Sequence, residues 1–87
     1  VSMPNVKFID PSAFEDCENL ESIYIPNVEY ISEYAFKGCK NLEYISIPQS
    51  ARVISVAAFQ DCNRNLKINY DKETYKSIDE FVEKYRS

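Results

Sequence analysis

The sequence predicts an α/β solenoid, a fold in which short repeated coils stack along one axis. Its main evidence is a period of 22 to 23 residues that runs through most of the chain. The same residue types return at this spacing in three columns: Pro4, Pro26 and Pro48; Phe14, Phe36 and Phe59; Cys17, Cys39 and Cys62. A period in this range is typical of solenoids, because each coil buries its apolar side only against the next coil.

Composition favours a small folded domain without catalytic chemistry. The 87 residues are 45% hydrophobic and 28% charged, which excludes a disordered tail and a membrane protein. Histidine, the commonest zinc ligand and general base, is absent. The first 36 residues hold seven acids against Lys7 alone, so this acidic half argues against binding nucleic acid or anionic lipid.

The period divides the chain into coils. We expect a strand remnant at residues 1–3, coils at 4–25, 26–47 and 48–70, and a C-terminal capping segment at 71–87. Val1, Ser2 and Met3 match the strand endings of the next two coils, so the chain begins inside a coil. We therefore expect a piece of a longer repeat protein. One extra residue between Pro48 and Ile54 falls in a connecting loop, where an insertion costs little.

Each coil is predicted to contain a strand, a turn, a short helix and a return. Residues 23–25 and 45–47 alternate apolar and polar positions, and the proline that follows each of them ends the strand. Asp10, Ser32 and Ser55 are expected to cap one or two helical or 3₁₀ turns. In the first coil the residues expected to point inward are Ile9, Ala13, Phe14, Cys17, Leu20, Ile23 and Ile25.

The capping segment contains a predicted amphipathic helix over residues 77–86. Ser77 and Glu80 form a capping box, and Ile78, Phe81, Val82 and Tyr85 share one helix face. We expect this helix to close the C-terminal end of the solenoid. The alternative is a helix that binds a partner.

The repeat resembles that of the BspA-like leucine-rich repeat family, most clearly over residues 25–42. Residues 68–78 are similar to the ending that often follows the last coil, although Glu73 replaces a glycine and tryptophan is absent. The resemblance implies a leucine-rich-repeat solenoid of about three coils with a short parallel sheet. It also implies a cell-surface or secreted protein that adheres to host matrix proteins or to other cells. No binding residues carry over, because the family motif consists of core residues.

A candidate protein-binding surface lies on the outer face of the strands, the concave surface that solenoids commonly use. Its residues are Glu21, Ser22, Tyr24, Glu43, Tyr44, Ser46, Lys67 and Asn69. Exposed tyrosines are enriched in interfaces. The function predicted is a non-enzymatic protein-binding or adhesion module. The alternative is a structural spacer or C-terminal cap of a larger array, whose exposed strand residues bind nothing.

No catalytic, cofactor or metal site is predicted. The spacing of Cys17, Cys39 and Cys62 does not match a zinc site, and we favour buried free thiols over a disulfide between neighbouring coils. The acids of the first coil lack the alternation and glycine of a calcium loop. Nothing in the segment predicts membrane insertion.

The N-terminal coil is predicted to expose an uncapped apolar side. Val6, Phe8, Ile9 and Phe14 would lack a neighbouring coil, and an open solenoid end invites pairing with another chain. We therefore expect self-association, with a dimer formed through this end.

Overall fold

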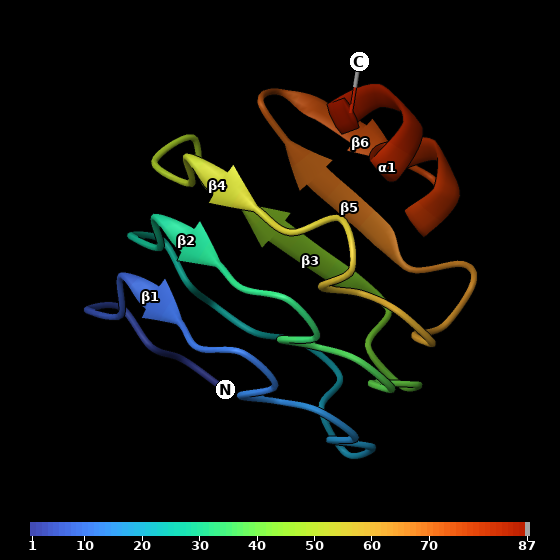
Figure 1. Ribbon diagram of the computed structural model, residues 1–87, viewed down its shortest axis with the longest axis horizontal. Coiled ribbons are helices and arrows are strands. Elements are labelled where there is room, and N and C mark those ends of the chain that lie inside the picture. The colour runs from blue at the N-terminus through green and yellow to red at the C-terminus, as the bar shows by residue number, and fades with distance from the viewer. Residues whose placement is uncertain (87) are drawn as a thin grey trace.

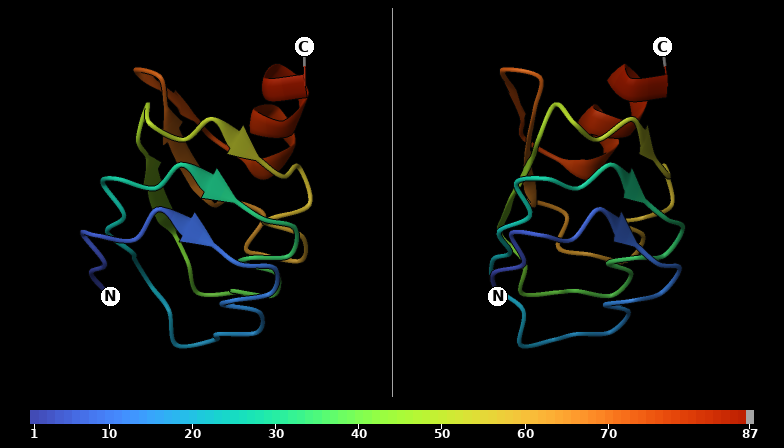
Figure 2. Two further views of the ribbon diagram at one scale, coloured as in Figure 1. Left: turned by 60° about the vertical axis from the view of Figure 1, so that its left-hand side comes forward. Right: turned by 90° about the vertical axis from the view of Figure 1, so that its left-hand side faces the viewer.

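A computed structural model describes residues 1–86. Six short strands form two small sheets, and one helix follows them in the chain (Figure 1). The elements are β1 (Phe8–Ile9), β2 (Tyr30–Ile31), β3 (Tyr44–Ile47), β4 (Val53–Ile54), β5 (Lys67–Tyr70), β6 (Glu73–Tyr75) and α1 (Ile78–Arg86). One sheet has the order β1-β2-β4 and the other the order β3-β5-β6. Figure 2 shows the two sheets on opposite sides of the stack, with α1 at the end away from the N-terminus.

The parallel strands join residues that lie one period apart in the sequence. Tyr30 of β2 stands opposite Phe8 of β1 and Val53 of β4. In the other sheet Ile45 pairs with Ile68, and Ser2 forms an isolated parallel bridge with Tyr24. Stacked repeats require this register, because each inward residue then packs on its own equivalent.

The segment that follows each of the periodic prolines Pro4, Pro26 and Pro48 differs from its prediction. It was expected to be a connecting loop, but it contains the strands β1, β2 and β4. The pairs Phe8-Ile9, Tyr30-Ile31 and Val53-Ile54 each place one residue outside and the other inside. Each of the three coils therefore has a short strand after its proline that was not predicted, whereas residues 23–25, predicted as a strand, form only the isolated bridge at Tyr24.

The short helices predicted within the repeats are wrong. Residues 11–16, 33–38 and 56–61, which we call the turn segments, form turns instead. A left-handed residue ends each of them, namely Asp16, Gly38 or Asp61, with φ of 59°, 75° and 61°. In the first two segments alternate N–H groups bond the next turn segment, as Phe14 N–H does to the Ala35 carbonyl (2.7 Å). A helix needs those N–H groups for its own carbonyls four residues back.

The caps predicted for these turns are formed in part. Ser55 Oγ accepts a hydrogen bond from Ala57 N–H at 3.2 Å. The main-chain carbonyl accepts a bond at all three sites: Asp10 from Ala13 N–H, Ser32 from Ala35 N–H and Ser55 from Ala58 N–H. No side-chain cap is recorded for Asp10 or Ser32 in residues 1–86.

A column of aromatic rings runs through the core. Phe14, Phe36 and Phe59 stack with centroids 5.5 Å apart and nearly parallel planes. Phe81 of α1 meets the last ring edge-on at 6.4 Å, so the helix closes the column. At the opposite end Ala13, predicted to point inward, is exposed, because no equivalent residue covers it from below.

The tail reverses direction before the helix begins. Asp71 and Lys72 both have positive φ (52° and 68°), as a tight hairpin turn requires, and β6 runs antiparallel to β5. Ser77 Oγ accepts a bond from Glu80 N–H, which confirms the predicted N-cap of α1. Within residues 1–86, no helix has the length and apolar character needed to cross a bilayer.

Candidate functional site

The candidate binding face is built by alternation along the strands. In β3, Tyr44 and Ser46 point outward while Ile45 and Ile47 are buried. Because strand side chains alternate between faces, burial of the isoleucines dictates that their neighbours face solvent. Seven of the eight predicted residues are exposed: Glu21, Ser22, Tyr24, Glu43, Tyr44, Ser46 and Lys67. The eighth, Asn69, is half-buried.

A chain of polar contacts crosses this face from β3 to β6. Ser46 Oγ donates to Asn69 Oδ1 at 3.4 Å, and Asn69 Nδ2 donates to Thr74 Oγ1 at 3.1 Å. These bonds fix the Asn69 amide and explain its partial burial. Sequence reasoning missed Thr74, because β6 was not predicted as a strand.

Two tyrosines supply the large exposed surface of the face. Tyr24 is 59% exposed and Tyr44 is 46% exposed. Tyr44 stands opposite Lys67 in the β3–β5 register, while Tyr24 pairs through its backbone with Ser2. Glu43 N–H bonds the Glu21 carbonyl (3.4 Å) and its own carbonyl accepts from Lys67 N–H (3.1 Å). Backbone bonds therefore tie most of the predicted residues into one surface.

A second exposed row lies on the β1-β2-β4 sheet. Phe8 is 59% exposed and stacks on Tyr30 with centroids 5.0 Å apart. The Arg52 guanidinium covers Tyr30 at 5.5 Å and donates to its hydroxyl at 3.0 Å, while Glu29 lies 3.8 Å from Arg52. This row could have been found from the sequence, because an aliphatic or aromatic residue recurs just before Ile9, Ile31 and Ile54.

The uncapped apolar side predicted for the first coil needs one correction. Ile9 is only 2% exposed, because it points inward from β1 and is covered by the core. Val6 and Phe14 are half-buried, and Phe8 is turned outward. The open part of this end therefore consists mainly of Ala13, Phe14 and Cys17.

The three cysteines carry free thiols, as favoured from the sequence, but only Cys39 is buried, whereas Cys17 and Cys62 are half-buried. Cys39 Sγ donates to the Phe14 carbonyl at 3.1 Å, and Cys62 Sγ donates to the Phe36 carbonyl at 2.9 Å. Burial, assisted by the nearby Cys62, raises the pKa of Cys39 to about 11. Burial also raises the pKa of Cys62. Neither thiol is activated as a nucleophile, because activation requires a lowered pKa.

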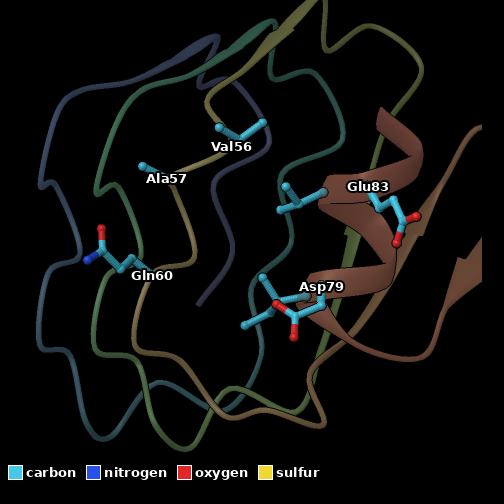
Figure 3. A pocket seen from close by; sticks show the side chains of 7 residues that line it. Val56, Ala57, Gln60, Asp79 and Glu83 are labelled. Carbon is cyan, nitrogen blue, oxygen red and sulfur yellow. The ribbon is translucent and has the colours of Figure 1, made fainter. Parts of the chain in front are cut away.

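A groove of about 600 Å³ separates the turn segment 56–61 from α1, with Val56, Ala57 and Gln60 on one wall (Figure 3). Ile78 and Val82 form the apolar wall on the helix, and Asp79 and Glu83 lie on its rim. Among the described residues, no group of three or more cysteine, aspartate or glutamate side chains is placed to hold a metal ion.

Pairing of equivalent residues through parallel strands defines this chain as a repeat protein. It belongs to the family described as the BspA type leucine-rich repeat region, whose model matches residues 1–84. No curated protein and no solved structure matches the chain. Leucine-rich repeats are typically non-enzymatic modules of protein interaction.

Proposed function

We propose that this chain is a non-enzymatic protein-binding or adhesion module of a cell-surface or secreted leucine-rich-repeat protein. Its partner would be a host matrix protein or another surface protein. The observation that supports the proposal most directly is the pair of exposed tyrosines, Tyr24 and Tyr44, on a face whose other side chains are polar.

The physical argument begins with the cost of ordering an interface. A tyrosine offers a large amphipathic contact and loses little side-chain entropy, since it has two rotatable bonds. The Ser46–Asn69–Thr74 contacts already hold the neighbouring polar groups in place. A partner therefore meets a largely preorganised surface, which reduces the free-energy cost of association.

The charges on this face suggest where selectivity arises. Glu21 and Glu43 are exposed on one side, and Lys67 is exposed next to Tyr44 in the register. Exposed rim charges act mainly on the association rate and on the choice of partner. We therefore expect binding that weakens with salt while the tyrosines supply most of the affinity.

A second candidate function is a structural spacer or C-terminal cap, with coils at 4–25, 26–47 and 48–70 and a capping segment at 71–87. Its support is the C-terminal tail, whose contacts cover the end of the repeat core. Phe81 is 1% exposed against the core, and Tyr85 Oη accepts a bond from Ile54 N–H at 3.2 Å. In this function the outer face of the strands binds nothing.

Binding of the full chain to an array of purified extracellular-matrix proteins separates the two functions. The test variant combines Tyr24→Ala and Tyr44→Ala, and the matched control is Tyr34→Ala, an exposed tyrosine on a turn segment. Loss of two interface tyrosines should weaken binding more than tenfold, since such anchors are each worth about 2 kcal/mol. The control should bind as the wild type does. Equal binding by all three proteins, or binding by none, would favour the spacer.

A further inference from the structure

The groove between the turn segment 56–61 and α1 has apolar side chains on both walls (Figure 3). Val56 is 38% exposed on the wall of the turn segment, and Ile78 and Val82 are half-buried on the wall of the helix. A second cavity of about 700 Å³ continues this groove, because Gln60, Ile78 and Asp79 line both. We call the two cavities together the cap groove. Each has a volume in the range of known ligand sites.

The hydrogen bonds between turn segments show which main-chain groups face along the stack toward α1. In the first segment, Phe14 N–H donates to the Ala35 carbonyl at 2.7 Å, and Asp16 N–H donates to the Lys37 carbonyl at 2.6 Å. The second segment makes the equivalent pair of bonds to the third, at 2.8 and 2.9 Å. A pair of N–H groups in one segment therefore matches two carbonyls that have one residue between them.

In the last turn segment the equivalent donors are the N–H groups of Phe59 and Asp61. Neither has an acceptor within residues 1–86. Phe81 of α1 covers the ring of Phe59, but a helix uses its carbonyls for its own N–H groups and leaves these two donors without a partner. Both residues line the second cavity of the cap groove, where Phe59 is buried and Asp61 is exposed. An unpaired main-chain donor at a buried residue is costly, so an acceptor that enters here is stabilised.

The charge of the cap groove identifies the kind of acceptor. Adjacent main-chain N–H groups can bind an anion as well as a carbonyl. The lining residues, however, include three acids against the single base Arg64: Asp61, Asp79 and Glu83. Such surroundings disfavour a phosphate or carboxylate and favour a neutral carbonyl accompanied by a positive charge. A peptide main chain with a lysine or arginine side chain meets both requirements.

We propose that the cap groove binds an extended, basic segment of a partner protein, whose main-chain carbonyls accept hydrogen bonds from Phe59 N–H and Asp61 N–H. An apolar side chain of this segment lies between Val56 and Val82, and a lysine or arginine faces Asp79. Main-chain bonds then supply affinity and the two side chains supply specificity, as in strand addition to a sheet edge. The inference goes beyond the function proposed above, because the cap groove contains none of the residues of the outer strand face.

The test uses the full chain and a capped hexapeptide of alternating lysine and valine, which carries the bases and the apolar side chains on opposite sides when extended. Hydrogen exchange reports directly on the two donors. We expect saturating peptide to slow the Phe59 and Asp61 amides at least about tenfold. The Phe14 amide, which is already bonded to Ala35, should keep its rate.

Two pairs of variants locate the binding site, with the dissociation constant of the peptide as readout. Asp79→Lys changes an acid that lines the cap groove, and its control Glu80→Lys makes the same change in charge at the next residue of α1, outside the groove. Val56→Ser removes part of the apolar wall, and its control Val53→Ser alters an exposed valine of β4. We expect each groove variant to bind about fivefold more weakly or worse, and each control to bind as the wild type does.

Three results would overturn the proposal. The first is equal binding of the peptide by all five proteins, or its absence at millimolar peptide, since the groove then does not recognise this chemistry. The second is equally tight binding of a capped glutamate–valine hexapeptide, which would contradict the charge preference. The third is slowing of the Phe59 and Asp61 amides by inorganic phosphate and not by the peptide, which would make the groove an anion site.

Discussion

The thiol of Cys39 donates a hydrogen bond to the main-chain carbonyl of Phe14, 25 residues earlier, at 3.1 Å. Cys62 makes the same bond to Phe36 at 2.9 Å. Cys39 is therefore a small buried residue, and both Cys39 and the half-buried Cys62 form a polar link between neighbouring repeats. A valine of similar size would fill the space but would leave the carbonyl with one bond fewer.

The pKa of about 11 for Cys39 predicts a loss of stability in alkaline solution. An unfolded thiol ionises near its ordinary pKa of 9.0, whereas the folded thiol keeps its proton up to about pH 11. Between these values the folded state binds more protons, so the free energy of unfolding falls as pH rises. The loss attributable to Cys39 should be about 2 to 3 kcal/mol.

Urea unfolding at pH 8 and at pH 10.5 measures this effect. The Cys39→Ala variant is the comparison, because it keeps the other groups whose pKa is raised, Cys62, Tyr70 and Tyr75. The variant should be less stable than the wild type at pH 8, and that difference should shrink at pH 10.5. A difference that stays constant between the two pH values would show that Cys39 does not titrate in this range.

Phe36 is predicted to be the most costly core residue to truncate. It is fully buried, with a stacked ring on each side, so Phe36→Ala should reduce the free energy of unfolding by about 3 to 5 kcal/mol. Phe8→Ala is the control, because that ring is 59% exposed and its loss should cost below about 1 kcal/mol. Urea titration of both variants measures which substitution lowers the free energy of unfolding more. Phe36→Leu provides a milder change if the alanine variant does not fold. Equal losses for the two phenylalanines would contradict the role assigned to the ring column.

The column of rings, the strand at residues 45–47 and the C-terminal helix were predictable from the sequence, since each depends on the spacing of apolar residues. The strand predicted at residues 23–25 is not formed, because Tyr24 makes only an isolated bridge with Ser2. Phe14, Phe36 and Phe59 recur with the period, and Ile78, Phe81, Val82 and Tyr85 follow the helical repeat. Such patterns report burial directly, because the inward positions of a regular element must be apolar.

The local backbone was less predictable. An Ala-Phe pair after a capping residue is compatible with a helical turn, but each N–H has a choice between its own segment and the next repeat. In this fold Phe14 N–H bonds Ala35 and not a residue of its own turn. Strands of two residues such as β1 are too short to show alternation, so only their register with β2 reveals them. The outward direction of Tyr24 and Tyr44 was predictable, but the contact of Asn69 with Thr74 depends on the unpredicted hairpin.

Gly38 is predicted to resist substitution by alanine for two reasons. Its φ of 75° lies in the left-handed region, and a Cβ placed there would overlap the Asp16 carboxylate of the preceding repeat. We expect Gly38→Ala to destabilise the protein by about 1 to 2 kcal/mol. Thermal or urea unfolding measures this loss. In an Asp16→Gly background the overlap is removed and the strain of the positive φ remains, so the same substitution should cost less. An identical cost in both backgrounds would assign the whole effect to φ.

The bond from Ile54 N–H to Tyr85 Oη predicts how the tail protects the last repeat. Ile54 belongs to β4, and within residues 1–86 no strand pairs with β4 on the side away from β2. Tyr85→Phe removes the hydrogen-bond acceptor that α1 provides for this amide and should lower the free energy of unfolding by about 1 kcal/mol. The more specific readout is hydrogen exchange, in which the Ile54 amide should exchange faster while the Ile31 amide of β2 stays unchanged. Tyr24→Phe, which alters an exposed hydroxyl on the outer strand face, should change neither rate. If the Ile54 amide keeps its wild-type rate in Tyr85→Phe, packing of the ring and not the hydroxyl closes this end of the sheet.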